Sequence, residues 1–280
     1  MLDVALRDSE FRAIQQFLSA SAGIALTDAK KALVSGRLGK RLRVHGFGSY
    51  SDYLDLIGRD RAERQIALDL LTTNETYFFR EPKHFEFLQS TVLCHRTEIE
   101  SPEGGRGGFR IWSAAASSGE EPYTLAMVLE AAIGRAPWEI IGTDISTRML
   151  EKCRLARYPI EHAQHIPKPF LRDYCLRGKG PEEGFLRIVK PLRDRVRFLH
   201  ANLNGELPAL GKFDVIFLRN VMIYFDPETK RRLLQRLTEF LHPGGWLFIS
   251  HTETLHGMAN GLQQVSPSIY RKPSECSPSR

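Results

Sequence analysis

Apolar and polar positions are patterned differently in the two parts of the chain. Through residues 1–88, apolar residues recur three and four positions apart, as at Phe11, Ile14 and Leu18, and no strand-like alternation occurs. This spacing places apolar side chains on one face of a helix. The pattern predicts an all-helical N-terminal domain over residues 1–88.

From residue 109 onward, short apolar runs alternate with amphipathic stretches. The runs predict strands at residues 109–114, 139–144, 196–199, 213–218 and 246–250, and the stretches predict helices at residues 120–133, 146–156 and 227–241. Strands that alternate with helices form a mostly parallel sheet covered by helices on both faces. The predicted fold class is therefore α/β, a doubly wound sheet preceded by a small helical domain.

Glycine and proline mark the boundaries between these parts. A glycine-rich run at residues 101–108 continues neither pattern, so residues 89–108 are predicted to be a linker. The sheet domain then covers residues 109–272, and residues 273–280 form a loose tail. Inside that domain, residues 177–190 start with turn-forming residues and continue with strand-like alternation. They predict an antiparallel hairpin subdomain inserted at about residues 168–194.

Composition excludes several classes of protein. The 280 residues are 42% hydrophobic, and the net charge of +6 favours acidic partners without the charge density of a nucleic-acid-binding arm. No apolar run approaches the roughly 20 residues that span a bilayer, so we expect no membrane insertion. The N-terminus lacks the pattern of a secretory signal. The four cysteines show neither paired spacing nor a histidine at ligand spacing, so we expect no disulfide framework, no metal site and a cytoplasmic location.

Basic residues gather in one stretch of the helical region. Residues 30–43 hold six basic residues and no acidic one. Lys30, Arg37 and Arg41 are spaced so that a continuous helix would align them on one face. This face is either a solvated surface or a docking surface for an acidic partner.

The turn after the first predicted strand is a candidate ligand site, because ligands of open α/β sheets bind beyond the carboxyl ends of the strands. Residues 114–119 are small and include one glycine, and Glu120 and Glu121 follow. Two carboxylates would repel the pyrophosphate that a GxGxxG turn cradles, and they suit a ligand with an ammonium or sulfonium group. The alternative is that they only complement the helix dipole.

Asp144 ends the second predicted strand. An acidic residue about 20 positions after such a turn accepts hydrogen bonds from ribose hydroxyls, and the alternative is a cap on the helix that follows. Together with the turn, Asp144 indicates a nucleoside ligand without a diphosphate. S-adenosylmethionine fits best, because it combines adenosine, a sulfonium and an amino-acid end.

Four segments carry a family resemblance. They are residues 71–81 (LTTNETYFFRE), 112–123 (WSAAASSGEEPY), 177–184 (RGKGPEEG) and 219–225 (RNVMIYF). The sequence resembles the CheR-type chemotaxis receptor methyltransferases, which use S-adenosylmethionine to esterify glutamate side chains of bacterial chemoreceptors. The resemblance extends from the first helical segment to about residue 272. It implies a Rossmann-like class I methyltransferase sheet, S-adenosylhomocysteine as product, and a cytoplasmic enzyme that needs no metal.

The resemblance also implies roles for single residues. Cofactor contacts are implied for Asn74, Thr76, Arg80, Glu120, Asp144, Asn202, Leu203, Arg219 and Asn220. Glu120 would meet the methionyl ammonium, with Glu121 as the alternative, and Asn202 and Leu203 would contact the adenine. Arg80 and Tyr224 are the implied catalytic residues: Arg80 would pair with the cofactor carboxylate or position its reactive end, and Tyr224 would lie near the methyl group.

The implied partners are methyl-accepting chemotaxis receptors. Their methylation helices are rich in Glu and Gln, so the basic face of Lys30, Arg37 and Arg41 becomes the expected docking surface. Gly178, Gly180 and Gly184 resemble the glycine pattern of family members that bind a C-terminal receptor peptide by strand addition. Whether the receptors of this protein carry such a peptide stays open.

The expected chemistry needs few groups. A glutamate substrate has a pKa near about 4.3, so it is an ionised nucleophile at neutral pH and no general base is required. Three alternatives remain: an NAD-dependent oxidoreductase, a nucleic-acid methyltransferase and a non-catalytic cofactor-binding scaffold. The missing GxGxxG turn argues against the NAD-dependent oxidoreductase. Nucleic-acid methyltransferases that modify amino groups usually carry an Asn/Asp-Pro-Pro-Tyr run. Residues 219–222 (RNVM) lack its prolines, so we expect no nucleic-acid partner.

Overall fold

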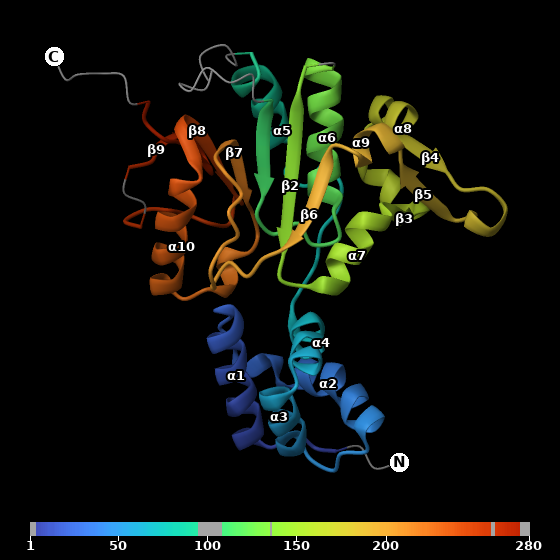
Figure 1. Cartoon of the computed structure of the whole chain (residues 1–280), viewed down its shortest axis with the longest axis vertical. Helices are drawn as coiled ribbons and strands as arrows, with labels where there is room; N and C mark the ends of the chain where they lie inside the picture. Colours follow the sequence, from blue (N-terminus) through green and yellow to red (C-terminus); the bar gives the residue numbers. More distant parts are fainter. Residues whose placement is uncertain (1–3, 95–107, 135, 259–260, 275–280) are drawn as a thin grey trace.

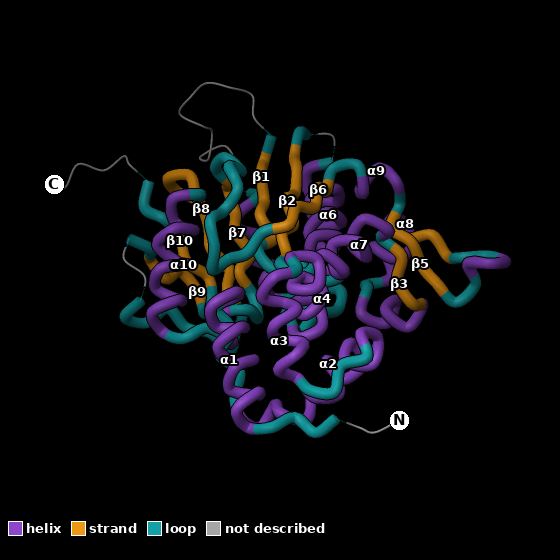
Figure 2. Tube along the Cα trace, turned by 60° about the horizontal axis from the view of Figure 1, so that its bottom comes forward, coloured by secondary structure: helices purple, strands orange, loops and turns teal. Residues whose placement is uncertain are grey.

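The computed structural model describes residues 4–94, 108–134, 136–258 and 261–274, so most of the predicted linker and tail lies outside the described residues. Figure 1 shows a group of helices at one end and a larger sheet domain at the other. Figure 2 shows these helices lying across the end of the sheet. The chain thus forms a small helical domain packed against a larger α/β domain.

The helical domain forms because one face of each helix is apolar. Its helices are α1 (Asp8–Ala22), α2 (Lys31–His45), α3 (Tyr50–Arg59) and α4 (Arg61–Leu71), with a short 3-10 turn, η1 (Asp28–Lys30), before α2. Phe11, Ile14 and Leu18 of α1 are buried in one core with residues of the other three helices, which confirms the predicted helical face. This core ends at Leu71.

The central sheet has seven strands in the order β6-β2-β1-β7-β8-β10-β9. Their bounds are β1 (Phe109–Ser113), β2 (Trp138–Asp144), β6 (Val196–His200), β7 (Phe213–Leu218), β8 (Leu241–Ile249), β9 (Gln263–Ser266) and β10 (Ile269–Arg271). The first five in the order are parallel, and β10 and β9 add an antiparallel edge. The predicted α/β class is confirmed, and the two short edge strands are an addition that the hydrophobic pattern did not predict.

Helices cover the two faces of this sheet. They are α5 (Lys83–Phe87), the π-helical segment η2 (Leu88–Val92), α6 (Glu120–Ile133), α7 (Thr147–Leu155) and α10 (Pro227–Glu239). Neighbouring residues of β1 enter different cores: Ile111 packs with α5 and α6, and Trp112 packs with α10. Both faces are therefore buried, as expected for a doubly wound sheet.

The structure groups residues 83–92 with the sheet, although the sequence pattern placed residues up to 88 in the helical domain. Phe85, Leu88 and Val92 share the core of α6 and the central strands, and none of them is in the core of α1–α4. Helical spacing identified the segment as a helix but carried no information about which core its apolar face would enter. The helical domain therefore ends at Leu71 rather than at residue 88.

A second sheet is inserted between α7 and β6. It has three antiparallel strands in the order β3-β5-β4, namely β3 (Arg157–Pro159), β4 (Cys175–Arg177) and β5 (Phe185–Ile188). It is completed by η4 (Ile160–His165), α8 (Lys168–Tyr174), η5 (Gly180–Glu182) and α9 (Lys190–Arg193). The predicted hairpin is β4–β5, and β3 starts the subdomain at residue 157 instead of about 168. Figure 1 shows it projecting from the side of the molecule.

The two domains meet at the carboxyl ends of the parallel strands. The Ala25 N–H donates to the carbonyl oxygen of Tyr224 (2.8 Å), and Ile24 and Phe225 form an isolated antiparallel bridge. The Asn202 side chain, just beyond β6, donates to the carbonyl oxygen of Ser21 (2.6 Å). These contacts hold the helical domain over the edge where α/β sheets bind ligands. None of the described helices has the length and apolar character that a bilayer crossing requires.

Candidate functional site

A cavity of about 270 Å³ lies between the helical domain and the carboxyl ends of the strands. Four parts of the chain line it: the connection from α1 to α2, the stretch that follows α4, the turns after β1, β2 and β6, and the segment after β7. The cavity therefore occupies the crevice that the sequence pattern selected for a ligand. It is walled on one side by a second domain, which the pattern could not place.

Asp144 lies at the end of β2, on the wall of this cavity. Each of its carboxylate oxygens accepts one backbone N–H, from Ser117 (2.8 Å) and from Ser146 (2.8 Å). Burial raises the pKa of Asp144 to about 6, although these N–H groups oppose the shift. An ionised carboxylate has about four acceptor sites, so Asp144 can hold the two backbone groups and still accept hydroxyl groups of a ligand.

Glu120 and Glu121 begin α6 and point in different directions. Glu120 is 1% exposed, its carboxylate accepts from Ser118 Oγ (2.7 Å), and it lies 3.3 Å from His162 of the inserted subdomain. Glu121 lines the cavity, whereas Glu120 is not part of its wall. Glu121, the alternative, is thus the member of the pair on the cavity wall, and Glu120 contacts the inserted subdomain. Successive residues of a helix diverge by about 100°, so both cannot face the cavity.

Arg219 follows β7 and connects several walls of the cavity. Its guanidinium donates to Glu121 (2.9 Å) and lies 3.2 Å from Glu81. It also donates to the backbone carbonyl of Arg80. Arg219 is 6% exposed, so it is a buried cation held between two carboxylates. This arrangement fixes the Glu121 carboxylate and leaves it partly neutralised.

Asn220 continues the turn in a left-handed backbone conformation (φ 57°) and lines the cavity. The carboxylate of Glu253 holds this turn, since it accepts from the N–H groups of Asn220 and Ile223 (both 3.3 Å) and of Ser250 (2.9 Å). Burial raises the pKa of Glu253. Sequence reasoning missed Glu253, because its role depends on a contact between two distant turns.

The stretch after α4 carries the predicted Asn74, Thr76 and Arg80, and all three line the cavity. The Asn74 carbonyl accepts from Ser117 Oγ (3.0 Å), which ties this stretch to the turn after β1. The Arg80 guanidinium donates to the Glu75 carbonyl (2.8 Å) and lies over the Tyr77 ring at 5.7 Å. The stretch thus runs along the cavity from the helical domain to the sheet domain, and it carries the partly exposed guanidinium of Arg80.

Asn202 and Leu203 line the cavity as expected, but their side chains are not equally free to contact a ligand. The Asn202 amide is used within the protein, since it donates to Ser21 and accepts from the Asn204 N–H (3.0 Å). Leu203 is 8% exposed and offers an apolar surface. A planar apolar group of a ligand would therefore meet Leu203, while Asn202 shapes the turn and joins the domains.

Tyr224 lies in a 3-10 turn, η6 (Met222–Tyr224), on the cavity wall. Its backbone carbonyl accepts from Ala25, so the helical domain fixes its position. Ile223 and Tyr77 also line the cavity, and they are large hydrophobic residues that are 49% and 37% exposed. The outer rim of the cavity is therefore partly apolar.

The three residues of the predicted docking face have different surroundings. Lys30 is exposed and lines the cavity. Arg37 donates to the carbonyl oxygens of Leu71 (3.2 Å) and Thr72 (3.0 Å) at the end of α4, and Arg41 forms a two-bond ion pair with Glu63 (2.7 and 2.6 Å). Arg37 and Arg41 thus stabilise the helical domain itself, and Lys30 is the member of the set that stands at the cavity.

Gly178, Gly180 and Gly184 lie in the turn that joins β4 to β5. Gly180 and Gly184 have positive φ angles (57° and 82°), and a Cβ on Gly178 would come within 1.8 Å of the Glu182 carbonyl oxygen. The glycines are thus required by the shape of this turn. β4 is an edge strand of the small sheet, and Leu176 on it is 56% exposed.

Comparisons with known proteins agree with this architecture. A family profile described as "CheR methyltransferase, all-alpha domain" matches residues 9–72, and "CheR methyltransferase, SAM binding domain" matches residues 74–270. The chemotaxis protein methyltransferase of Escherichia coli (strain K12) is 40% identical over 272 residues, covering 95% of this chain and 92% of the relative. Chemotaxis protein methyltransferase 2 of Pseudomonas aeruginosa is 38% identical over 264 residues, covering 93% and 92%.

The two matched segments correspond to the two domains of the structure, and they meet at residues 72–74, where the chain leaves α4 and begins to line the cavity. The match to the S-adenosylmethionine-binding domain covers every predicted cofactor residue. The predicted resemblance is confirmed, and the chain belongs to the CheR methyltransferase family.

Proposed function

We propose that this protein transfers a methyl group from S-adenosylmethionine to glutamate side chains of chemoreceptors in the cytoplasm. One observation carries the proposal: two carboxylates, Asp144 and Glu121, line the same interdomain cavity. Asp144 can accept hydrogen bonds from ribose hydroxyls, and Glu121 is an anion that can face a cationic group. Relatives named chemotaxis protein methyltransferase support the receptor as the substrate.

The groups on the cavity wall fit S-adenosylmethionine by their chemistry. Asp144 is an acceptor for ribose hydroxyls, Leu203 offers an apolar surface for adenine, and Glu121 is an acceptor for an ammonium. Arg80 offers a guanidinium for a carboxylate. No helix N-terminus with a GxGxxG turn is available for a pyrophosphate, because Gly119 is followed by the two carboxylates. This set disfavours a nicotinamide dinucleotide.

The protein contributes alignment and exclusion of water. When bound, S-adenosylmethionine supplies an electrophilic methyl group on a sulfonium. The residues of both domains that meet over the cavity keep water from the reacting atoms, and the loss of opposite charges in a dry site favours transfer to a carboxylate. Tyr224 stands on the wall where its hydroxyl can orient the incoming carboxylate. A glutamate needs no base to become a nucleophile.

The rim of the cavity suits a receptor helix that carries Glu among apolar residues. Tyr77 and Ile223 are exposed apolar side chains, and Lys30 adds a positive charge to the lining of the same cavity. An amphipathic helix would place its apolar residues on Tyr77 and Ile223 and a carboxylate near Lys30. We therefore assign the receptor-docking role mainly to Lys30, since Arg37 and Arg41 are occupied within the helical domain.

The outer edge of β4 is the proposed site for a C-terminal receptor peptide. An edge strand presents unpaired backbone groups, so an extended peptide can add a strand to it. Leu176 is exposed on β4, and the rigid glycine turn at Gly178 positions the strand. Binding there would raise the local concentration of the receptor without entering the cavity.

The decisive experiment incubates the protein with methyl-labelled S-adenosylmethionine and membranes that contain chemoreceptors. We expect label on the receptors that is released by mild alkali, because methyl esters hydrolyse in base. Asp144→Ala is the matched negative control. Alkali-stable label would indicate methylation of nitrogen, and no label despite tight binding of S-adenosylhomocysteine would indicate a non-catalytic scaffold. Either result would contradict the proposal.

A further inference from the structure

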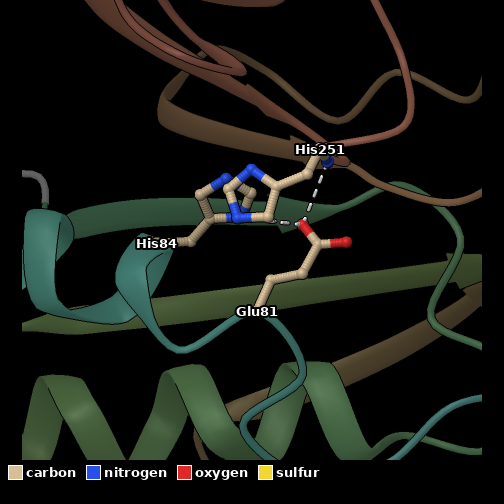
Figure 3. Close-up of side chains that lie close together, drawn as sticks. All are labelled: Glu81, His84 and His251. Carbon is tan, nitrogen blue, oxygen red and sulfur yellow. Dashed lines mark hydrogen bonds and ion pairs between the residues drawn. The ribbon is translucent and has the colours of Figure 1, made fainter.

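Glu81, His84 and His251 converge beside the cavity and are called here the histidine cluster. Glu81 and His84 lie at the start of α5, and His251 lies in the turn after β8. Figure 3 shows the two imidazole rings next to the Glu81 carboxylate. Glu81 Oε2 lies 3.4 Å from His84 Nδ1 and 3.9 Å from His251 Nε2. Each of the three residues offers one ligand atom, and these atoms lie within 4.8 Å of one another.

Ser268 determines which ring nitrogens carry hydrogen. Its hydroxyl oxygen lies 2.6 Å from the Pro267 carbonyl oxygen, 2.7 Å from His84 Nε2 and 3.0 Å from His251 Nδ1. The carbonyl can only accept, so it takes the single hydroxyl hydrogen. Both imidazoles must then donate to Ser268 through Nε2 of His84 and Nδ1 of His251.

The opposite ring nitrogens consequently present lone pairs to the Glu81 carboxylate. His84 is 1% exposed, and its Nδ1 is buried without a hydrogen-bond partner. These two ring nitrogens and a carboxylate oxygen thus face one another with no hydrogen between them. Such groups repel unless a cation lies among them.

We propose that the histidine cluster binds a divalent transition-metal ion of the Zn²⁺ class. Two imidazole nitrogens and one glutamate oxygen are the protein ligands of many zinc sites that keep a fourth position for water. A tetrahedral site with bonds near 2.05 Å separates its ligand atoms by about 3.4 Å, close to the distances of 3.4 and 3.9 Å between Glu81 Oε2 and the two imidazole nitrogens. Ser268 holds the outer nitrogen of each imidazole, as outer hydrogen-bond partners do in metal sites.

The backbone around the cluster supports a specific role. Glu81 and Ser268 both have positive φ angles (59° and 60°), a conformation that is costly for residues other than glycine and is retained where the surroundings enforce it. Arg219 lies 3.2 Å from Glu81 Oε2 and competes with an ion for that oxygen. A carboxylate has acceptor sites on two oxygens, so Glu81 can serve both cations. The ion would then connect α5, the turn after β8 and the turn before β10.

Direct titration of the full chain tests the site. Chelator-treated protein is titrated with Zn²⁺ against a chromophoric indicator, and the melting temperature is followed in parallel. We expect one equivalent to bind and the melting temperature to rise. His251→Ala should weaken binding by at least about tenfold and Ser268→Ala by about 10- to 100-fold. His256→Ala removes an exposed histidine of the same loop and should leave binding unchanged.

Co²⁺ distinguishes this cluster from a cysteine site. The protein loaded with Co²⁺ should show no thiolate charge-transfer absorption, since no cysteine belongs to the cluster. The His251 side chain is 42% exposed, so its replacement is compatible with folding. Failure of the wild-type chain to bind Zn²⁺ saturably, equal binding by His251→Ala, or a thiolate signal would each overturn the proposal.

Discussion

Glu121 at the start of α6 accepts a hydrogen bond from Arg219 at the end of β7, with 2.9 Å between Oε2 and Nη1. Ser113, at the end of β1, donates to the other carboxylate oxygen (2.7 Å). The two contacts fix Glu121 from both sides while it lines the cavity. A negative group held in this way is preorganised for a cationic part of the ligand.

The first prediction separates the two neighbouring carboxylates. Glu121→Gln removes the charge that faces the ligand, and we expect the Kd for S-adenosylhomocysteine to rise by about 10- to 100-fold, the equivalent of one lost charged hydrogen bond. Glu120→Gln is the matched control and should leave the Kd near the wild-type value. Calorimetry measures both. The reverse order of effects would show that Glu120 faces the ligand.

The second prediction concerns pH. Burial raises the pKa of Asp144 to about 6, so the carboxylate is ionised above that pH and protonated below it. The ionised form accepts ribose hydroxyls better, so the Kd for S-adenosylhomocysteine should rise as the pH falls through 6, by up to about tenfold per unit. Binding measured between pH 8 and 5 tests this. In Asp144→Asn the dependence should be absent; if it persists, another group is responsible.

The third prediction assigns a stabilising role to Arg41. Glu63 accepts hydrogen bonds from Arg41 and from the Tyr53 hydroxyl (2.8 Å) in the helical core. Arg41→Ala leaves this carboxylate without its cation, and we expect a loss of about 1–3 kcal/mol in the free energy of unfolding. Arg43→Ala, on an exposed position of α2, should cost within about 0.5 kcal/mol. Urea unfolding compares them, and equal effects would refute the assignment.

The fourth prediction tests the docking surface without disturbing the fold. Lys30→Glu reverses a charge at the cavity rim, so we expect the receptor KM to rise about tenfold at low salt and less at high salt. Lys40→Glu reverses an exposed charge elsewhere on α2 and should change little. Cofactor affinity is measured for both variants. A parallel loss of cofactor binding in Lys30→Glu would place Lys30 in the cofactor site instead.

The fifth prediction concerns the Tyr224 hydroxyl. Tyr224→Phe keeps the ring and the backbone contact with Ala25, so the fold should persist. Loss of one hydrogen bond to the reacting carboxylate corresponds to about a tenfold lower kcat, with the Kd for S-adenosylhomocysteine unchanged. Single-turnover methylation of receptors measures this. Full turnover in the variant would remove the hydroxyl from the mechanism.

Local patterns in the sequence were sufficient for the main elements. Helical spacing of Phe11, Ile14 and Leu18 predicted α1, and the apolar run at residues 213–218 predicted β7. The position of Asp144 at a strand end, in an α/β protein, also predicted that it would reach the ligand crevice. These predictions hold because strand and helix periodicity depend on neighbouring residues, and because ligand sites of such sheets lie at a fixed edge.

The same reasoning did not predict the short strands β3, β9 and β10. Each has three or four residues, too few to show an alternating pattern. They exist because neighbouring strands satisfy their backbone groups, as β8 does for β10. Their formation therefore depends on pairing across the fold rather than on their own residues.

The sequence by itself determined which segments become helices and strands, where Asp144 would lie, and which family the chain belongs to. Only the tertiary structure decided that Glu121 rather than Glu120 faces the cavity, that Arg41 is committed to Glu63, and that His84 meets His251. The physical reason is that periodicity is a local property of the chain. The direction of a polar side chain and its partner depend instead on how distant elements pack.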